Sequence, residues 1–290
     1  MIKNLLFIIR APFIILWRIV LWLKNLLIGF VSSGYHFLTY EPEDSDIVEI
    51  AEKVGKDPTV LFPQIEALRR HIFRSLLFLM ITTGFSFYYA QDILSWLTRP
   101  LSGGLMSLNV IDVTEPISVF MRVSLLSGFT LALPYILFEI LIFIGEGLRR
   151  KTRLFLILFV MPMSLLLFIG GMAFAYFIML PVAVPFLLSV LNFQTTVRAS
   201  SYVKFVTNIM FWMGAIFEFP MIIFVIAKLG WIKANALLHQ WRLAIVIIAV
   251  VAALITPTVD PVNMAIVMGP MILLYFLSIG LAFIAQPKST

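Results

Sequence analysis

The chain has no cysteine among its 290 residues, which excludes disulfide frameworks, thiolate zinc sites and haem-thiolate centres. Histidine is also scarce, and His36, His71 and His239 are too scattered in the sequence to form a cluster of metal ligands. We therefore expect neither a metal nor another cofactor.

Charged residues are few as well. They make up 12% of the chain, whereas an average soluble domain carries about 25%. Hydrophobic residues make up 61%, which predicts an all-α polytopic membrane protein with one membrane domain. No removable signal peptide is expected, because the first residues lack a small-residue cleavage site after a short apolar core.

Sequence motifs of hydrolytic and redox chemistry are missing too. The chain contains no glycine-rich phosphate loop, no GxSxG elbow, no HExxH and no paired intramembrane aspartates. Serines such as Ser164 do lie within apolar segments, but helix-interior serines usually bond back to backbone carbonyls. We expect neither an enzyme nor a nucleic-acid-binding protein.

Six apolar segments are candidates for membrane-spanning helices. The fifth has 13 residues, about 20 Å of helix, so the bilayer thins there, flanking residues snorkel, or the helix starts earlier, near Leu237. Pro134 offers a kink in the second segment, Pro181 should end the third, and Pro270 should interrupt the sixth. The segments are His71–Ala90, Ile117–Gly145, Leu154–Leu180, Phe205–Ala227, Leu243–Ile255 and Asn263–Ala285.

Lysine and arginine are divided unequally between the two predicted sides of the membrane. Seventeen of the 21 fall on one side, and only Arg99, Arg122, Arg198 and Lys204 fall on the other. Because basic loops stay in the cytoplasm, we expect a multi-pass protein of the cell inner membrane with both termini cytoplasmic.

Residues 2–31 are apolar enough for a seventh span, but Lys3, Arg10, Arg18 and Lys24 recur along them. On a helix these four lie within a wedge of roughly 120°. We favour a basic amphipathic helix in the cytoplasmic interface, drawn to anionic lipid, over a tilted span. The expected organisation is an interfacial helix (1–35), an acidic linker (36–62), a six-helix membrane domain (63–285) and a tail (286–290).

Glu218 is the only charged residue of the fourth apolar segment and lies near its middle. A charge at that depth costs roughly 2.5–3.5 kcal/mol on insertion scales, so the carboxyl group must face helices, water or a partner. Counting back along a helix places Gly214, Phe211, Thr207 and Lys204 on its face. Contact with a partner's helix, a bond to a hydroxyl within the bundle, and a role as a proton-relay acid all stay open.

A set of short segments shares its order and spacing with one known family. Gln64–Arg70 precedes the first span, Thr114–Pro116 opens the second, and Pro134–Glu139 and Phe143–Leu148 lie at its end. The others are Gly171–Phe177 with Pro181, Ser201–Tyr202, Phe217–Pro220, Ile255–Thr258 and Asp260–Pro261. Together these segments resemble TatC, the polytopic core of the twin-arginine protein translocase.

This resemblance implies a receptor and scaffold. TatC proteins bind the twin-arginine signal peptides of folded cargo at the cytoplasmic face and recruit the single-span subunits TatA and TatB. Transport is driven by the proton-motive force, without nucleotide. The resemblance also implies a curved bundle and homo-oligomers within a larger complex. Glu218 and Thr207 are implied to contact a partner helix from the concave face.

Two glutamates would bind the paired arginines, because carboxylates match guanidinium groups best. This sequence departs from the family at both positions, with Ala67 at the first and Thr152 at the second. We expect Glu66 and Glu146 to bind the paired arginines from these shifted positions. Pairing of each with a neighbouring arginine is the alternative.

Four further residues match the family's signal-peptide site or its partner contacts. Arg69 belongs to the first motif, and Phe143 and Leu148 match apolar positions that line the signal-peptide groove by resemblance. Ordinary packing or lipid contact is the alternative for the apolar pair. Glu139 matches a polar position at a partner-helix contact, and pairing with a neighbouring helix inside the bundle is equally open.

The main rival function is a proton-coupled secondary transporter in which Glu218 is the coupling acid. Such folds often contain two internal repeats with broken helices at matching positions. No repeat is visible here, because the long second segment and the short fifth and sixth segments have no counterparts.

Overall fold

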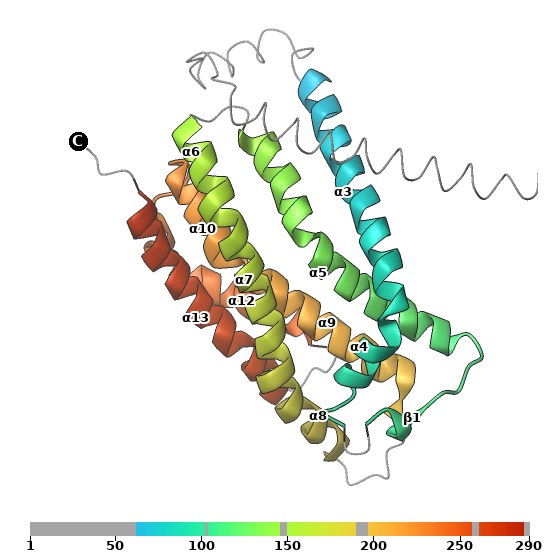
Figure 1. Cartoon of the computed structure of the whole chain (residues 1–290). Coiled ribbons are helices and arrows are strands. Elements are labelled where there is room, and N and C mark those ends of the chain that lie inside the picture. The colour runs from blue at the N-terminus through green and yellow to red at the C-terminus, as the bar shows by residue number, and fades with distance from the viewer. Residues whose placement is uncertain (1–61, 102–103, 146–149, 190–196, 257–260, 287–290) are drawn as a thin grey trace, which may run out of the picture. The chain divides into compact units, whose positions relative to one another are not determined.

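The computed structural model describes residues 62–101, 104–145, 150–189, 197–256 and 261–286 (Figure 1). The chain divides into two compact units, and the larger one, Arg69–Glu139 with Leu156–Thr290, holds most of the described residues. The expected interfacial helix, and nearly all of the linker and tail, lie outside the described residues.

Helices make up nearly all of the described chain. The first half contains α3 (Phe62–Tyr88), α4 (Ala90–Leu97), a 3-10 turn (Gly104–Ser107), α5 (Glu115–Gly145) and α6 (Arg150–Phe155). A third long segment follows as a π-turn (Leu156–Val160), α7 (Met161–Phe174), a second π-turn (Ala175–Met179) and α8 (Leu180–Ser189). The second half contains α9 (Ala199–Phe217), α10 (Phe219–Lys228), α11 (Ala234–His239), α12 (Trp241–Ile255) and α13 (Pro261–Ala285).

Among the described residues, four continuous helices are long and apolar enough to cross a membrane, and α3 with α4 makes a fifth if that pair, bent by 74°, is one span. The predicted all-α membrane class is therefore confirmed. The helix α12, with 15 residues, is shorter than these spans, so the count of six stays a prediction. The four continuous spans are Glu115–Ile144, Leu156–Leu188, Ala199–Lys228 and Asn263–Ala285.

Two predictions about proline are wrong. Pro181 does not end its helix but lies in the first turn of α8, directly after the second π-turn. The helix is continuous from the π-turn into α8, and the π-turn shifts the hydrogen-bond pattern locally, so a residue without an N–H group is accommodated there. Pro270 does not interrupt α13, which is continuous around it. Membrane helices tolerate such prolines because neighbouring groups can satisfy the freed carbonyl.

The short fifth segment does not start early. The preceding helix α11 ends at His239, and Gln240 separates it from α12 with backbone angles φ −95° and ψ 16°. These angles lie outside the helical region, so the two helices do not form one span starting near Leu237.

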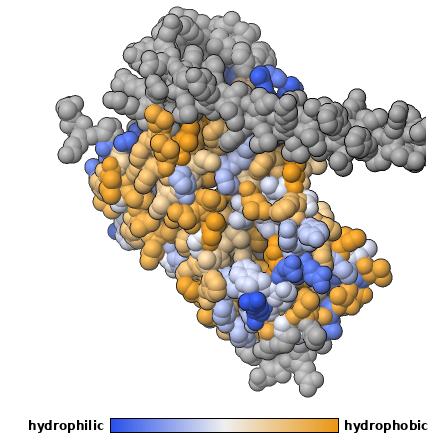
Figure 2. All heavy atoms as spheres, in the orientation of Figure 1, coloured by the Kyte–Doolittle hydropathy of each residue, from blue (hydrophilic) through white to orange (hydrophobic). Residues whose placement is uncertain are grey.

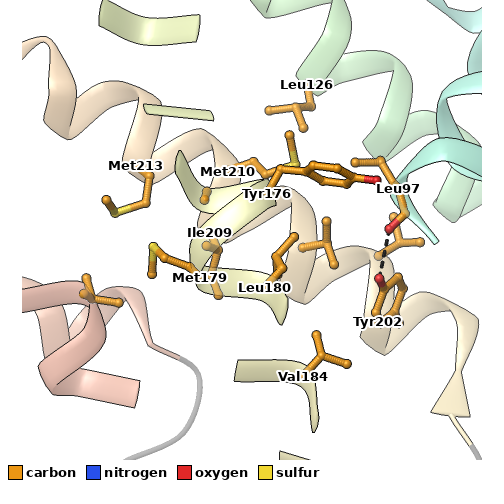
Figure 3. Close-up of a cluster of buried hydrophobic side chains, with 14 of the residues drawn as sticks. Leu97, Leu126, Tyr176, Met179, Leu180, Val184, Tyr202, Ile209, Met210 and Met213 are labelled. Atoms are coloured by element: carbon orange, nitrogen blue, oxygen red, sulfur yellow. Dashed lines mark hydrogen bonds between the residues drawn. The ribbon is translucent and has the colours of Figure 1, made fainter. Parts of the chain in front are cut away.

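The core of the larger unit is built where α4, α5, α8, α9 and the second π-turn meet (Figure 3). Tyr202 and Tyr176 each donate a hydrogen bond to a carbonyl at the end of α4, at 2.9 Å to Leu97 and 2.7 Å to Trp96. Elsewhere α10 packs along α13, and α7 packs along α9. Tight van der Waals contact and buried hydroxyl bonds are the forces that associate helices in lipid.

Large hydrophobic side chains cover most of the face shown in Figure 2, and the most hydrophilic residues lie towards its upper and lower ends. Leu158, Leu254 and Ile284 are 74%, 80% and 75% exposed. A soluble protein rarely exposes such continuous apolar surface, whereas lipid tails solvate it. This surface agrees with a multi-pass membrane protein.

At the end of the larger unit where α5 and α9 begin, a short parallel sheet joins β1 (Leu108–Asn109) to β2 (Val197–Arg198). Glu115, the first residue of α5, is 3% exposed and accepts hydrogen bonds from both sides of this junction. Its Oε1 accepts the Ser200 amide at 2.7 Å, and its Oε2 accepts the Ile111 amide at 2.9 Å. The carboxylate thereby ties the start of α9 to the loop before α5.

Candidate functional site

Glu218 occupies a break in a membrane-spanning segment. It lies between α9 and α10, and Pro220 follows within the first turn of α10. Because proline lacks an N–H group, the regular hydrogen-bond ladder cannot pass through this point unchanged. Glu218 is 8% exposed.

Each oxygen of this carboxyl group has a different environment. The Ser164 hydroxyl of α7 donates a hydrogen bond to Oε2 of Glu218. The other oxygen, Oε1, is buried and accepts no hydrogen bond from any residue that the structure describes. Glu218 is thus braced on one side and retains hydrogen-bonding capacity on the other.

Glycines bring α7 and α9 together at the level of Glu218. Ser164, Phe168 and Gly171 follow one another at helical spacing on α7, and all three are buried. A Cβ atom on Gly214 would lie 2.8 Å from the Phe168 ring. This close approach lets the short serine side chain reach Glu218, which lies one helical turn beyond Gly214.

The other residues predicted on the Glu218 face have mixed environments. Thr207 is buried and donates its hydroxyl to the Val203 carbonyl at 2.6 Å. Phe211 packs edge-on against Phe129 of α5, with 5.2 Å between ring centroids, and Lys204 is exposed. The serine bond is what the hypothesis of a hydroxyl-tied acid expects, whereas contact with a partner's helix stays a prediction.

Glu139 on α5 is paired inside the larger unit. Its Oε2 lies 2.5 Å from Nδ1 of His71 on α3, and its Oε1 accepts the Tyr135 hydroxyl at 2.7 Å. Glu139 is 3% exposed, and the Tyr135 ring stacks on Phe78 with centroids 4.4 Å apart. This is pairing with a neighbouring helix, one of the two arrangements left open above, and a contact with a partner helix is not tested.

The sequence places Tyr135 one helical turn before Glu139, and the structure shows the two side chains hydrogen-bonded. The other partners of the two acids, His71 and Ser164, were not identified from the sequence. The contact with His71 joins residues 68 positions apart, and that between Ser164 and Glu218 joins residues 54 apart. No local pattern indicates either one.

The predicted signal-peptide residues are described only in part. Glu66 and Arg69 are exposed residues of α3, and Phe143 is a partly buried residue of α5. Glu146 and Leu148 lie outside the described residues. Thr152, which stands at the family's second acidic position, is a partly buried residue of α6.

Comparison with known proteins decides the family. The family model described as the Sec-independent protein translocase protein TatC matches residues 64–270 of the chain. The chain belongs to the TatC family.

Curated TatC proteins and solved TatC structures agree with this membership. The TatC of Koribacter versatilis is 32% identical over 232 residues, covering 78% of this chain and 85% of that protein. The TatC of Aquifex aeolicus is 34% identical over 236 residues, covering 79% of this chain and 96% of that protein. A crystal structure of the twin arginine translocase receptor TatC superimposes with a TM-score of 0.66 at 31% identity, covering 77% of this chain and 99% of the other.

TatC membership and the apolar helices together make this chain a multi-pass membrane component of a Sec-independent protein translocase. The predicted resemblance and fold class are confirmed. The individual roles of Glu66, Glu146, Glu218 and the other site residues remain predictions.

Proposed function

We propose that this TatC protein is the twin-arginine signal-peptide receptor and scaffold of a Tat translocase, which moves folded proteins across the cell inner membrane using the proton-motive force. Both termini face the cytoplasm in this proposal, as the uneven distribution of basic residues indicates. It is a binding and assembly protein, not an enzyme. Its partners are TatA, TatB and the signal peptides of folded cargo.

The half-satisfied carboxyl group of Glu218 is the observation that supports this proposal most directly. A buried acceptor without a partner costs about 1–3 kcal/mol. A donor from another helix would recover that free energy, and it would have to reach Oε1, because Ser164 already occupies Oε2. A polar residue in the single span of TatA or TatB is a donor of this kind.

Thr207 and Glu139 support the same partner contact less directly. The Thr207 hydroxyl donates to a backbone carbonyl but keeps an acceptor lone pair. Both oxygens of Glu139 are engaged within the chain, so its main contribution would be to hold α3 against α5. We place Glu218 first among the partner-binding residues for this reason.

The signal-peptide site is proposed at the cytoplasmic ends of α3 and α5. Glu66 and Glu146 would bind the two guanidinium groups, and Arg69 would contribute polar contacts. Phe143 and Leu148 would meet the apolar core of the peptide. Bidentate binding of arginine by carboxylates explains why two acids are needed at this site.

Site-specific photocrosslinking tests both parts of the proposal. A photoreactive residue at position 66 or 146 should capture a twin-arginine peptide, and lysine substitution of its arginine pair should abolish the adduct. A photoreactive residue at position 218 should capture TatA or TatB. Capture of neither the peptide nor a partner from any of the three positions would refute the proposal.

A flux measurement separates the proposed function from the rival transporter. The protein reconstituted alone should leave vesicles tight to protons and small solutes, because a translocase core needs its partners to conduct. Proton-coupled solute uptake that Glu218→Gln abolishes would instead support the transporter.

A further inference from the structure

Two basic side chains lie unpaired near the beginnings of α5 and α9. Arg122 and Lys204 are both exposed, and neither forms an ion pair with a residue that the structure describes. Basic residues inside membrane spans are costly and usually face a partner of opposite charge. Arg122 and Lys204 are therefore expected to bind an anion from outside the described chain.

The nearby acids do not neutralise them. Glu115 accepts Nε of Arg198 at 3.1 Å in addition to its backbone donors, and Asp112 pairs with the same guanidinium group. These contacts raise the pKa of Arg198, with the hydrogen bond to Glu115 as the largest cause. Both acidic side chains at this junction, Asp112 and Glu115, are therefore paired with Arg198. The positive charges of Arg122 and Lys204 are not neutralised by either of them.

Arg122 and Lys204 each lie on a row of residues along one face of their helix, and two contacts join the row on α5 to the row on α9. We call these two rows stripes. Glu115, Arg122 and Phe129 repeat every seven residues on α5, so they share one face of the helix. On α9, Ser200, Lys204 and Phe211 follow at intervals of four and seven residues, which also places them on one face of a helix.

The first members of the two stripes touch, because Glu115 accepts the Ser200 amide, and the last members touch through the Phe129–Phe211 ring contact. Arg122 and Lys204 lie between these contacts, one on each stripe. Two cations held at the same level repel each other unless an anion lies between them.

Their depth corresponds to the edge of the hydrocarbon core. The spans that contain them have 30 residues each, about 45 Å of helix, against a core of about 30 Å. Arg122 is seven residues from the start of its span and Lys204 is five, so their Cα atoms lie roughly 7–10 Å inside the helix ends. Long basic side chains rooted there extend to the level of the lipid phosphates.

We propose that Arg122 and Lys204 form a binding site for the phosphate of a phospholipid headgroup, between α5 and α9 in the leaflet at the β1–β2 end of the helices. Arginine binds phosphate through a planar pair of donors, and lysine adds a point charge. An anionic phospholipid suits the site best, because two positive charges remain to be neutralised. The acyl chains would lie along the exposed apolar flanks of the helices.

The test uses the natural lack of cysteine in this chain. Asn208→Cys, at an exposed position one helical turn beyond Lys204, provides a unique fluorophore site. The full-length labelled protein is reconstituted in phosphatidylcholine vesicles that contain a small fraction of spin-labelled lipid. Quenching by spin-labelled phosphatidylglycerol is then compared with quenching by spin-labelled phosphatidylcholine.

We expect stronger quenching by phosphatidylglycerol, and a preference that falls about fivefold on Arg122→Gln and again on Lys204→Gln, as expected for one charge at a membrane surface. Arg122→Lys, which keeps the positive charge, should retain most of the preference for phosphatidylglycerol. That result would show that the preference depends on charge. Arg99→Gln, which removes another exposed basic residue of the same side, should leave the preference unchanged.

Two results would overturn the proposal. The first is equal quenching by the two lipids in the parent protein, and the second is an unchanged preference in the Arg122→Gln/Lys204→Gln double variant. Millimolar inorganic phosphate should not displace the lipid, and displacement would assign the site to free phosphate instead.

Discussion

Gly171 of α7 lies so close to Met213 of α9 that a Cβ atom on the glycine would stand 2.5 Å from the Met213 carbonyl oxygen. Real Cβ atoms do not approach backbone oxygens this closely, so any larger residue forces the helices apart. The same crossing positions Ser164 against Glu218. The geometry of the buried acid therefore depends on a glycine that never touches it.

The first prediction follows from this crossing. Gly171→Ala should lower the free energy of unfolding by about 1–3 kcal/mol, the usual cost of overpacking a tight interface. Gly170→Ala is the matched control, because a Cβ atom there would meet nothing within 4 Å. Unfolding of both variants in mild detergent, followed by circular dichroism, gives the comparison. Equal stability of the two variants would contradict the close crossing.

A second prediction concerns the bond between His71 and Glu139. His71→Ala should destabilise the protein by about 1–3 kcal/mol, because a buried oxygen of Glu139 loses its partner. Tyr135→Phe, which removes the bond to the other oxygen, should cost about 1 kcal/mol.

A double-mutant cycle isolates this pair from its surroundings. His71→Ala should cost much less in a Glu139→Leu background, where no buried carboxyl group is left unpaired. A coupling free energy of at least about 0.5 kcal/mol between positions 71 and 139 is expected for residues in direct contact. A coupling of zero would show that the two side chains do not stabilise each other in the folded protein.

The third prediction addresses the junction at Glu115. Glu115→Ala removes the acceptor of the Ser200 and Ile111 amides and leaves Arg198 facing only Asp112. We expect a loss of about 1–3 kcal/mol, and proteolysis at the loop before α5 should become faster. Asp112→Ala removes an exposed ion pair and should cost less than about 1 kcal/mol. A larger effect at Asp112 than at Glu115 would contradict this assignment.

The helices could be predicted because hydrophobicity is a local property. The sequence of α5 is apolar over more than the roughly 20 residues that a membrane-spanning helix needs, and the structure has one long helix there. Pro181 misled the prediction, since whether proline ends a helix depends on the hydrogen bonds of the preceding turn. The π-turn at Ala175–Met179 supplies that context, and it has no clear sequence signal.

The site was less predictable because its contacts are long-range. Most buried serines follow the local rule, as Ser124 and Ser278 donate to the carbonyls four residues earlier. Ser164 breaks that rule and donates to Glu218 instead. The exception depends on how closely α7 and α9 approach, which the sequence of neither helix specifies alone. The unusual position of Glu218 was visible from the sequence, whereas its partner was not.

The last prediction separates bracing from partner contact at Glu218. Glu218→Ala removes both oxygens and should abolish transport while leaving the affinity for a twin-arginine peptide unchanged. Ser164→Ala removes only the internal bond and should cost about 1–3 kcal/mol of stability, because it leaves Glu218 less satisfied. If the acid serves a partner, Ser164→Ala should retain most of the transport, since Oε1 is unaffected.

Transport of a folded reporter and peptide binding, measured on the same membranes, give the comparison. If bracing were the whole role of Glu218, Ser164→Ala and Glu218→Ala would reduce transport in parallel with stability. Full transport by Glu218→Ala would exclude both the partner and the relay roles. Loss of transport together with peptide binding would place the carboxyl group in the receptor step instead.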